Sequence, residues 1–220
     1  MKFMRLLGPV ALLSFVALVG ATIAGLLLVP AEASLPVHWG VDGKADAFWP
    51  RNFALLMPPL VLAAVLAVMA LVVARGKDTG GSLNGLRAGL AAIGLAMAAI
   101  QSGSVAIALG YPVDMVRLIA FVIGFMLIGL GNVMPKSQPN SYSGFRLRWT
   151  LESPANWQAT NRFAGVLMML GGVVIVLAAL FFPHPAWLLA AIVAGIAVPT
   201  LSGIIYSYRY AQKERARRPA

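Results

Sequence analysis

Long apolar stretches dominate the chain, and a short polar segment separates each stretch from the next. A helix needs about 20 residues, at about 1.5 Å each, to cross the hydrocarbon core of a bilayer. Six stretches reach that length, at about 6–29, 53–74, 86–109, 115–134, 163–182 and 186–208. The pattern therefore predicts an all-α, polytopic membrane protein with six transmembrane helices.

Composition agrees with this fold class. Hydrophobic residues make up 60% of the chain and charged residues 11%, whereas a soluble domain carries about 25% charged residues. The net charge of +10 would fit nucleic acid, but the basic residues fall at the ends of the apolar stretches. That placement favours topology signals and contacts to lipid headgroups, so we expect the bilayer and no direct nucleic-acid partner.

Lysine and arginine are distributed unevenly between the two sides of the predicted bundle. With the N-terminus inside, the outer side holds only Lys44, Arg51 and Arg117. The inner side holds the other fourteen: Lys2, Arg5, Arg75, Lys77, Arg87, Lys136, Arg146, Arg148, Arg162, Arg209, Lys213, Arg215, Arg217 and Arg218. The positive-inside rule then predicts a multi-pass protein of the bacterial cytoplasmic (inner) membrane with both termini in the cytoplasm.

The first apolar stretch has a second interpretation. Lys2 and Arg5 precede it and Ala31-Glu32-Ala33 follows it, as in a secretory signal peptide with an A-x-A cleavage site. A signal peptide has an apolar region of roughly 7–15 residues, and this one runs from Leu6 to Val29. Its length favours a retained span, with cleavage as the alternative.

The outer loop at residues 30–52 contains the candidates for a metal site. His38, Asp42 and Asp46 fall within nine residues, and His184 is expected on the same side. Imidazole and carboxylate suit zinc or a similar ion, but the spacing matches no strong motif, and Asp42-Gly43 indicates a turn. We favour turn-capping and interfacial roles for these residues and predict no metal and no cofactor.

The longest polar interruption, residues 131–165, is the richest candidate for recognition. If residues 144–150 are extended, Phe145, Leu147 and Trp149 fall on one side and Arg146 and Arg148 on the other. After them, Ser153-Pro154 is a helix-start signal, serine at the cap and proline at the first position. We expect a helix to run from there into the fifth span.

The same two loops resemble the SdpI family of bacterial membrane proteins. The matching residues of the inner segment are Gly131-Asn132, Pro135-Lys136, Pro139-Asn140, Gly144, Arg146, Trp149-Thr150-Leu151, Trp157, Thr160 and Gly165. The outer loop resembles the P-x-H-W…G…D module of many members through Pro36, His38, Trp39, Gly43 and Asp46. The chain departs from the family at Arg148, where proline is frequent, and at Asn161, where histidine is frequent.

The resemblance implies toxin immunity, signal transduction to a cytoplasmic partner, or both. A peptide toxin would act on the outer side, and a regulator such as a repressor would bind the inner segment. The residues expected to bind that partner are Lys136, Asn140, Arg146, Arg148, Trp149, Thr150, Trp157 and Asn161. We predict no catalytic residues, because both histidines lie across the membrane from the serines of the inner segment, and no enzyme activity.

Two other functions stay open. A small-solute transporter would need polar residues such as Gln101, Ser102 and Asn132 to converge on one cavity, although no charge falls in the middle of any span, which counts against ion coupling. A metal-dependent membrane enzyme would need His38, His184 and an aspartate within coordination distance.

The sequence divides into three consecutive parts. Residues 1–74 hold the first helix pair with the outer loop, 75–134 the central pair, and 135–220 the inner segment with the last two helices.

Overall fold

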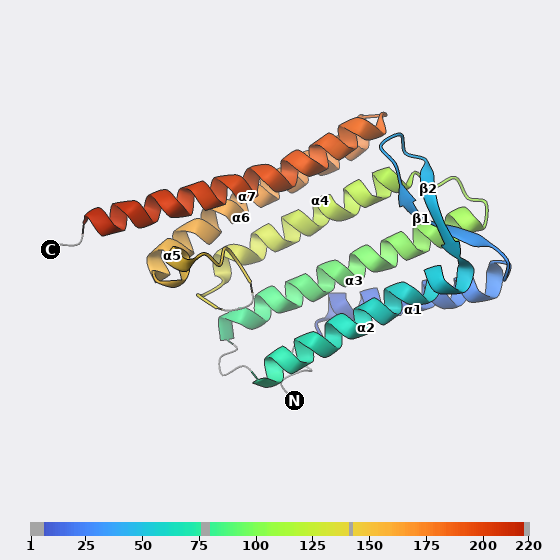
Figure 1. Cartoon of the computed structure of the whole chain (residues 1–220), viewed down its shortest axis with the longest axis horizontal. Coiled ribbons are helices and arrows are strands. Elements are labelled where there is room, and N and C mark those ends of the chain that lie inside the picture. Colours follow the sequence, from blue (N-terminus) through green and yellow to red (C-terminus); the bar gives the residue numbers. More distant parts are fainter. Residues whose placement is uncertain (1–6, 76–79, 141–142, 218–220) are drawn as a thin grey trace.

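A computed structural model describes residues 7–75, 80–140 and 143–217 of the chain (Figure 1). Its long helices are α1 (Pro9–Leu28), α2 (Arg51–Arg75), α3 (Gly80–Ala108), α4 (Met115–Val133), α6 (Pro154–Phe181) and α7 (Pro185–Ala216). Between them lie the strands β1 (Ser34–Trp39) and β2 (Ala45–Pro50), the 3-10 turn η2 (Met134–Lys136) and the short helix α5 (Arg148–Leu151).

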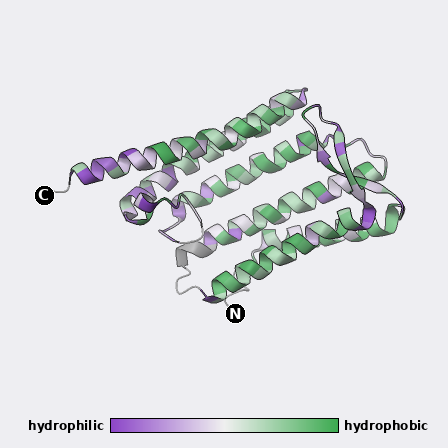
Figure 2. Cartoon of the chain, in the orientation of Figure 1, coloured by the Kyte–Doolittle hydropathy of each residue, from purple (hydrophilic) through white to green (hydrophobic). Residues whose placement is uncertain are grey.

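Within the described residues, six helices are long and apolar enough to cross a membrane. Figure 2 shows that their middle parts are hydrophobic and that hydrophilic residues gather towards the ends. Large apolar side chains face outward from them, as at Leu27, which is 78% exposed, and Phe181, which is 73% exposed. The prediction of a helical, multi-pass membrane protein is confirmed.

The last two helices are longer than their apolar stretches. Helix α6 begins at Pro154 rather than near residue 163, because the Ser153 side chain accepts a hydrogen bond from the Asn156 amide and caps it. The predicted helix start at Ser153-Pro154 is therefore confirmed. Helix α7 continues to Ala216 rather than stopping near residue 208, so hydropathy marks only the part of each helix that lies in hydrocarbon.

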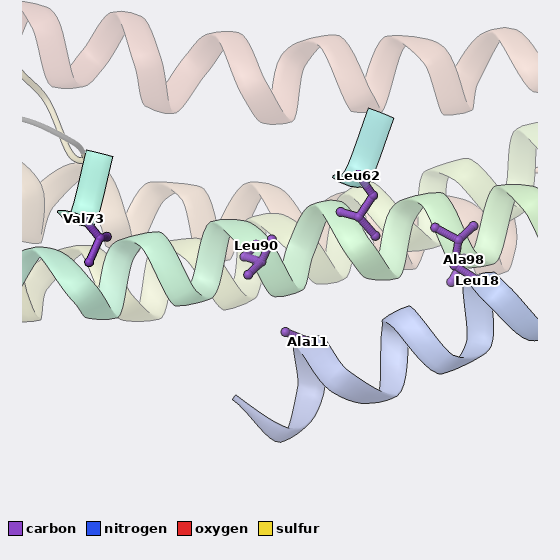
Figure 3. Close-up of a cluster of buried hydrophobic side chains, with 6 residues drawn as sticks. All are labelled: Ala11, Leu18, Leu62, Val73, Leu90 and Ala98. Carbon is purple, nitrogen blue, oxygen red and sulfur yellow. The ribbon is translucent and has the colours of Figure 1, made fainter. Parts of the chain in front are cut away.

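Two of the three buried clusters in the described residues each join three helices. One cluster, drawn in Figure 3, joins α1, α2 and α3 through Ala11, Leu18, Leu62, Val73, Leu90 and Ala98. A second joins α4, α6 and α7 through Ala120, Leu127, Ile175, Ala178, Ala179 and Leu188. In these two clusters α3 packs with the first two helices and α4 with the last two, and α3 and α4 also pack against each other.

Glycines let α4 and α6 touch backbone to backbone. A Cβ on Gly131 would lie 2.5 Å from the Gly165 carbonyl oxygen, and a Cβ on Gly172 would lie 2.5 Å from the Gly124 carbonyl oxygen. Small residues at helix contacts are how membrane helices gain close van der Waals packing without a hydrophobic driving force.

Gln101 repairs a break in the hydrogen bonding of α2. Pro58 and Pro59 lie inside that helix, and Pro59 has no N–H to give to the carbonyl of Leu55 four residues earlier. The Gln101 side chain of α3 donates to that carbonyl at 3.0 Å and lies 3.3 Å from the Thr22 hydroxyl of α1. One buried amide therefore links α1, α2 and α3, the interhelical role that lipid-embedded polar residues often take.

The loop at residues 30–52, predicted to lie on the outer side, forms a β-hairpin that the sequence did not predict. Strands β1 and β2 pair antiparallel from Ser34 opposite Pro50 to Trp39 opposite Ala45. The expected turn at Asp42-Gly43 is present, with Gly43 at a φ of +81°. The prolines indicated only helix breaks, but proline is also tolerated in edge strands, and both strands of a two-stranded sheet are edges.

Two of the three basic residues at the hairpin end of the bundle have structural partners. Arg51 donates to the carbonyls of Leu26 and Val29 at 3.3 and 2.7 Å, at the C-terminus of α1. Arg117 donates to the carbonyls of Ala179 and Phe182 at the C-terminus of α6. Cations stabilise the unsatisfied carbonyls of a helix C-terminus, so two of the three exceptions to the charge asymmetry have a structural role.

Candidate functional site

The described residues of the segment 134–153, which are 134–140 and 143–153 and are called the 134–153 loop below, lie against the first turns of α6 and the far part of α7, at the end of the bundle opposite the hairpin (Figure 1). The loop comprises η2, an irregular stretch and α5. Most of the residues that carry the family resemblance lie in it or on the helix face beneath it.

Trp157 of α6 anchors the first half of the loop. Its side chain is fully buried, and its indole N–H donates to the Ser137 carbonyl at 3.0 Å. The chain passes directly over the ring at Gly144, whose φ is +99° and where a Cβ would lie 3.0 Å from the indole. Glycine is required there because another residue would meet both strain and a clash.

Asn161 and Thr150 hold the second half of the loop. Asn161 accepts a hydrogen bond from the Phe145 amide at 3.0 Å and donates to the Trp157 carbonyl at 3.0 Å. The Thr150 hydroxyl accepts from the Leu147 amide at 3.0 Å and lies within hydrogen-bond distance of the Phe145 carbonyl. These contacts fix the backbone on both sides of Arg146.

Ser207 of α7 joins the loop to both of the last helices. Its hydroxyl accepts from the Trp149 indole at 3.0 Å, and its carbonyl accepts from the Asn156 side chain at 3.0 Å. Further along α7, the Glu214 carboxylate accepts from the Ser153 hydroxyl at 2.9 Å. Sequence reasoning missed Ser207 and Glu214, since a lone serine in an apolar helix and a lone carboxylate in a basic tail give no pattern.

The buried side-chain polar groups of this region are all hydrogen-bonded among the described residues. In the part of the chain that the structure describes, every buried side-chain nitrogen and oxygen has a hydrogen-bond partner. A fully satisfied polar network of this kind specifies one arrangement of the loop, because each broken bond would leave a buried group unpaired.

The predicted partner-binding residues divide into two groups. Thr150, Trp157 and Asn161 are fully buried and have no exposed surface, so any part they take in partner binding acts through the loop they hold. The others reach the surface, and they are Lys136, Asn140, Arg146, Arg148 and Trp149.

The predicted alternation along residues 145–149 is confirmed in its burial. Phe145, Leu147 and Trp149 are half-buried while Arg146 and Arg148 are exposed. The last two of these residues lie in α5, however, and are helical rather than extended. Glu152 accepts a hydrogen bond from Arg148 at 2.9 Å and, with its charge, raises the pKa of Arg148 above the ordinary value.

An apolar cavity of about 450 Å³ lies beside the loop. Its lining includes Leu130, Val133, Phe145, Leu147, Met168 and Ile204, from α4, the loop, α6 and α7. Arg146 is the charged residue in the described lining. The loop thus presents a cation next to an apolar hollow.

The outer-loop motif residues come together on the hairpin. His38 on β1 shares a hydrogen bond with Asp46 on β2, and the Lys44 amide donates to Asp42 across the turn at 3.1 Å. His184 accepts from the Ala186 amide at 3.2 Å and caps α7. Among the described residues, no three histidine, aspartate or glutamate side chains gather closely enough to hold a metal ion.

A second apolar cavity, of about 410 Å³, lies under the hairpin. Val37, His38 and Trp39 form its hairpin side, and α3, α4 and α7 contribute residues such as Ile100 and Ile192. The turn also contacts the start of α7, where a Cβ on Gly43 would lie 2.9 Å from Pro185. The hairpin therefore covers the end of the helix bundle.

The residues proposed for a transport path go to three different places. Gln101 is buried and bonded to α1 and α2, Ser102 is exposed, and the Asn132 side chain accepts from Lys136 at the end of α4 at 3.4 Å. They do not converge on one cavity.

Comparison with known proteins points to the same segment. Residues 136–207 match the SdpI/YfhL protein family. The chain is also 29% identical over 114 residues to the immunity protein SdpI of Bacillus subtilis (strain 168), an alignment that covers 52% of this chain and 54% of that protein. The chain thus spans about half the length of this curated relative. No solved structure matches.

The range matched by the family begins at Lys136 and ends at Ser207. It therefore contains the Trp157, Asn161 and Ser207 contacts and excludes the hairpin. Over this segment, the chain is similar to the SdpI/YfhL protein family.

Proposed function

We propose that the protein is an immunity-type protein of the bacterial inner membrane, which protects the cell against a membrane-active peptide and signals its state to a cytoplasmic partner. The observation that carries the proposal is the 114-residue similarity to the immunity protein SdpI. The multi-pass helical architecture supports it, because a protein that counters a membrane-active peptide acts where that peptide acts.

In this proposal, the peptide binds at the hairpin end of the bundle. The cavity under the hairpin is apolar and is bordered by His38, which is paired with Asp46. Such a hollow fits a large hydrophobic side chain of the peptide, since apolar burial is the main favourable term in recognition.

The cytoplasmic partner binds the 134–153 loop. Lys136, Arg146 and Arg148 are exposed there and suit an acidic partner through charge-assisted hydrogen bonds. Trp149 links the loop to Ser207 of α7, and Trp157 and Asn161 link it to α6. A shift of α6 against α7 would therefore move the loop, which gives the signal a physical path.

Expression in a peptide-sensitive bacterium tests the proposal. Cells carrying the wild-type chain should survive concentrations of a membrane-active peptide toxin that kill cells carrying an empty vector. Arg146→Ala should weaken signalling to a cytoplasmic partner, measured by co-purification from the membrane fraction, because it removes an exposed cation without touching the buried network.

Arg162→Ala is the matched control, since Arg162 is also an exposed arginine at the same end of the bundle but lies outside the loop. A wild-type chain that protects against no peptide of a broad panel would refute immunity. Equal partner capture by the two variants would refute a role for Arg146.

A further inference from the structure

We propose that the far end of α7 binds the headgroup of an anionic phospholipid, in a groove that the immunity proposal does not use. The groove, called the α7 groove below, encloses about 610 Å³ along one face of the helix beside Phe163 of α6. Its lining on α7 recurs every three or four residues, at Tyr206, Arg209, Tyr210, Lys213 and Arg217 among others, so these side chains share one face.

The charge of the α7 groove fits an anion. Arg209, Lys213 and Arg217 line it together with one carboxylate, that of Glu214. That carboxylate already accepts a hydrogen bond from the Ser153 hydroxyl at 2.9 Å. The three cations therefore outnumber the one acid, whose charge is partly satisfied by the 134–153 loop.

The depth of the α7 groove fits a headgroup. Counted from Pro185 at the opposite end of α7, about 20 residues of helix cross the hydrocarbon core, which ends near Ile205. Residues 206–217 then emerge at the level of the lipid phosphates. Cations at that level attract anionic lipid, each adding to the affinity.

Aromatic rings form the apolar part of the α7 groove. Phe163 stacks on Tyr206 with ring centroids 4.6 Å apart, and Tyr210 lies next to Tyr206 at 6.3 Å. Amphipathic rings favour the membrane interface. A ligand that is anionic at one end and apolar at the other matches this surface, whereas a soluble phosphate would use the cations alone. We therefore assign the α7 groove to a phospholipid.

The test is lipid retention by the purified full-length protein, measured by native mass spectrometry after release from a neutral detergent. Phosphatidylglycerol should be retained in preference to phosphatidylcholine of the same acyl chains. The double variant Arg209→Gln/Lys213→Gln should lose about tenfold in phosphatidylglycerol affinity, because two cations near the phosphate are removed.

The double variant Arg162→Gln/Arg215→Gln is the matched control. It removes two exposed cations from the same end of the protein, neither of which lines the α7 groove, and should retain phosphatidylglycerol as the wild type does. Circular dichroism checks that both double variants keep the helical fold. If either does not, the single variants Lys213→Gln and Arg215→Gln are compared instead. Equal losses in both variants, no preference for phosphatidylglycerol, or displacement of the lipid by soluble glycerol phosphate would overturn the proposal.

Discussion

Replacing Trp157 with alanine should release the 134–153 loop and lower the free energy of unfolding by about 3–5 kcal/mol. The indole is fully buried, packs under Gly144 and donates to the Ser137 carbonyl. Alanine would leave a cavity and an unpaired carbonyl together. Thermal unfolding in detergent measures the loss, and trypsin cleavage after Arg146 or Arg148 reports release of the loop.

Two further variants make that measurement specific. Trp157→Phe keeps a ring but removes the donor, so it should cost less, about 1–3 kcal/mol. Trp187→Ala removes a tryptophan that is 64% exposed on α7 and should leave both stability and cleavage nearly unchanged. A Trp157→Ala protein as stable and as trypsin-resistant as the Trp187→Ala protein would contradict the anchoring role.

Replacing Gly131 with valine should separate α4 from α6. The first added carbon would lie 2.5 Å from the Gly165 carbonyl oxygen, which is backbone and cannot rotate away. Overpacking at such a contact costs about 1–3 kcal/mol or more. We expect a lower midpoint of thermal unfolding and a smaller monodisperse fraction in size-exclusion chromatography.

Gly129→Val, two residues earlier on the same helix, is the control. Gly129 is exposed, and a Cβ there would meet nothing within 4 Å. The two variants add the same side chain to the same helix. The effects of valine on helix propensity and on hydrophobicity are therefore the same in both and cancel in the comparison. Equal destabilisation by both would show that the contact between α4 and α6 is not the cause.

The sequence predicts most of this fold because the bilayer imposes a simple rule. Hydrocarbon requires about 20 apolar residues and satisfied backbone bonds, so the six spans follow from hydropathy alone. The start of α6 was also predictable, since Ser153 and Pro154 are local capping signals. Local chemistry of this kind leaves a clear pattern in the sequence.

The hairpin and the Ser207 contacts show where sequence reasoning stops. Pro36 and Pro50 indicate helix breaks, but only pairing partners decide that the intervening chain forms strands. Ser207 contacts Trp149 across 58 positions, and no local pattern records such a pair. Trp157 was predicted as a partner anchor because tryptophan favours interfaces, yet the same properties suit it to the core that it occupies.

The most direct test of the account asks which side of the membrane the 134–153 loop faces. The chain has no cysteine, so single cysteines give unambiguous labels, and Lys44 in the hairpin turn and Gln138 in the loop are both exposed. In intact cells, a membrane-impermeant maleimide should label the Lys44→Cys variant, and it should label the Gln138→Cys variant only after the membrane is permeabilised. Labelling of Gln138→Cys in intact cells, with Lys44→Cys protected, would place the loop outside and contradict the proposed route to a cytoplasmic partner.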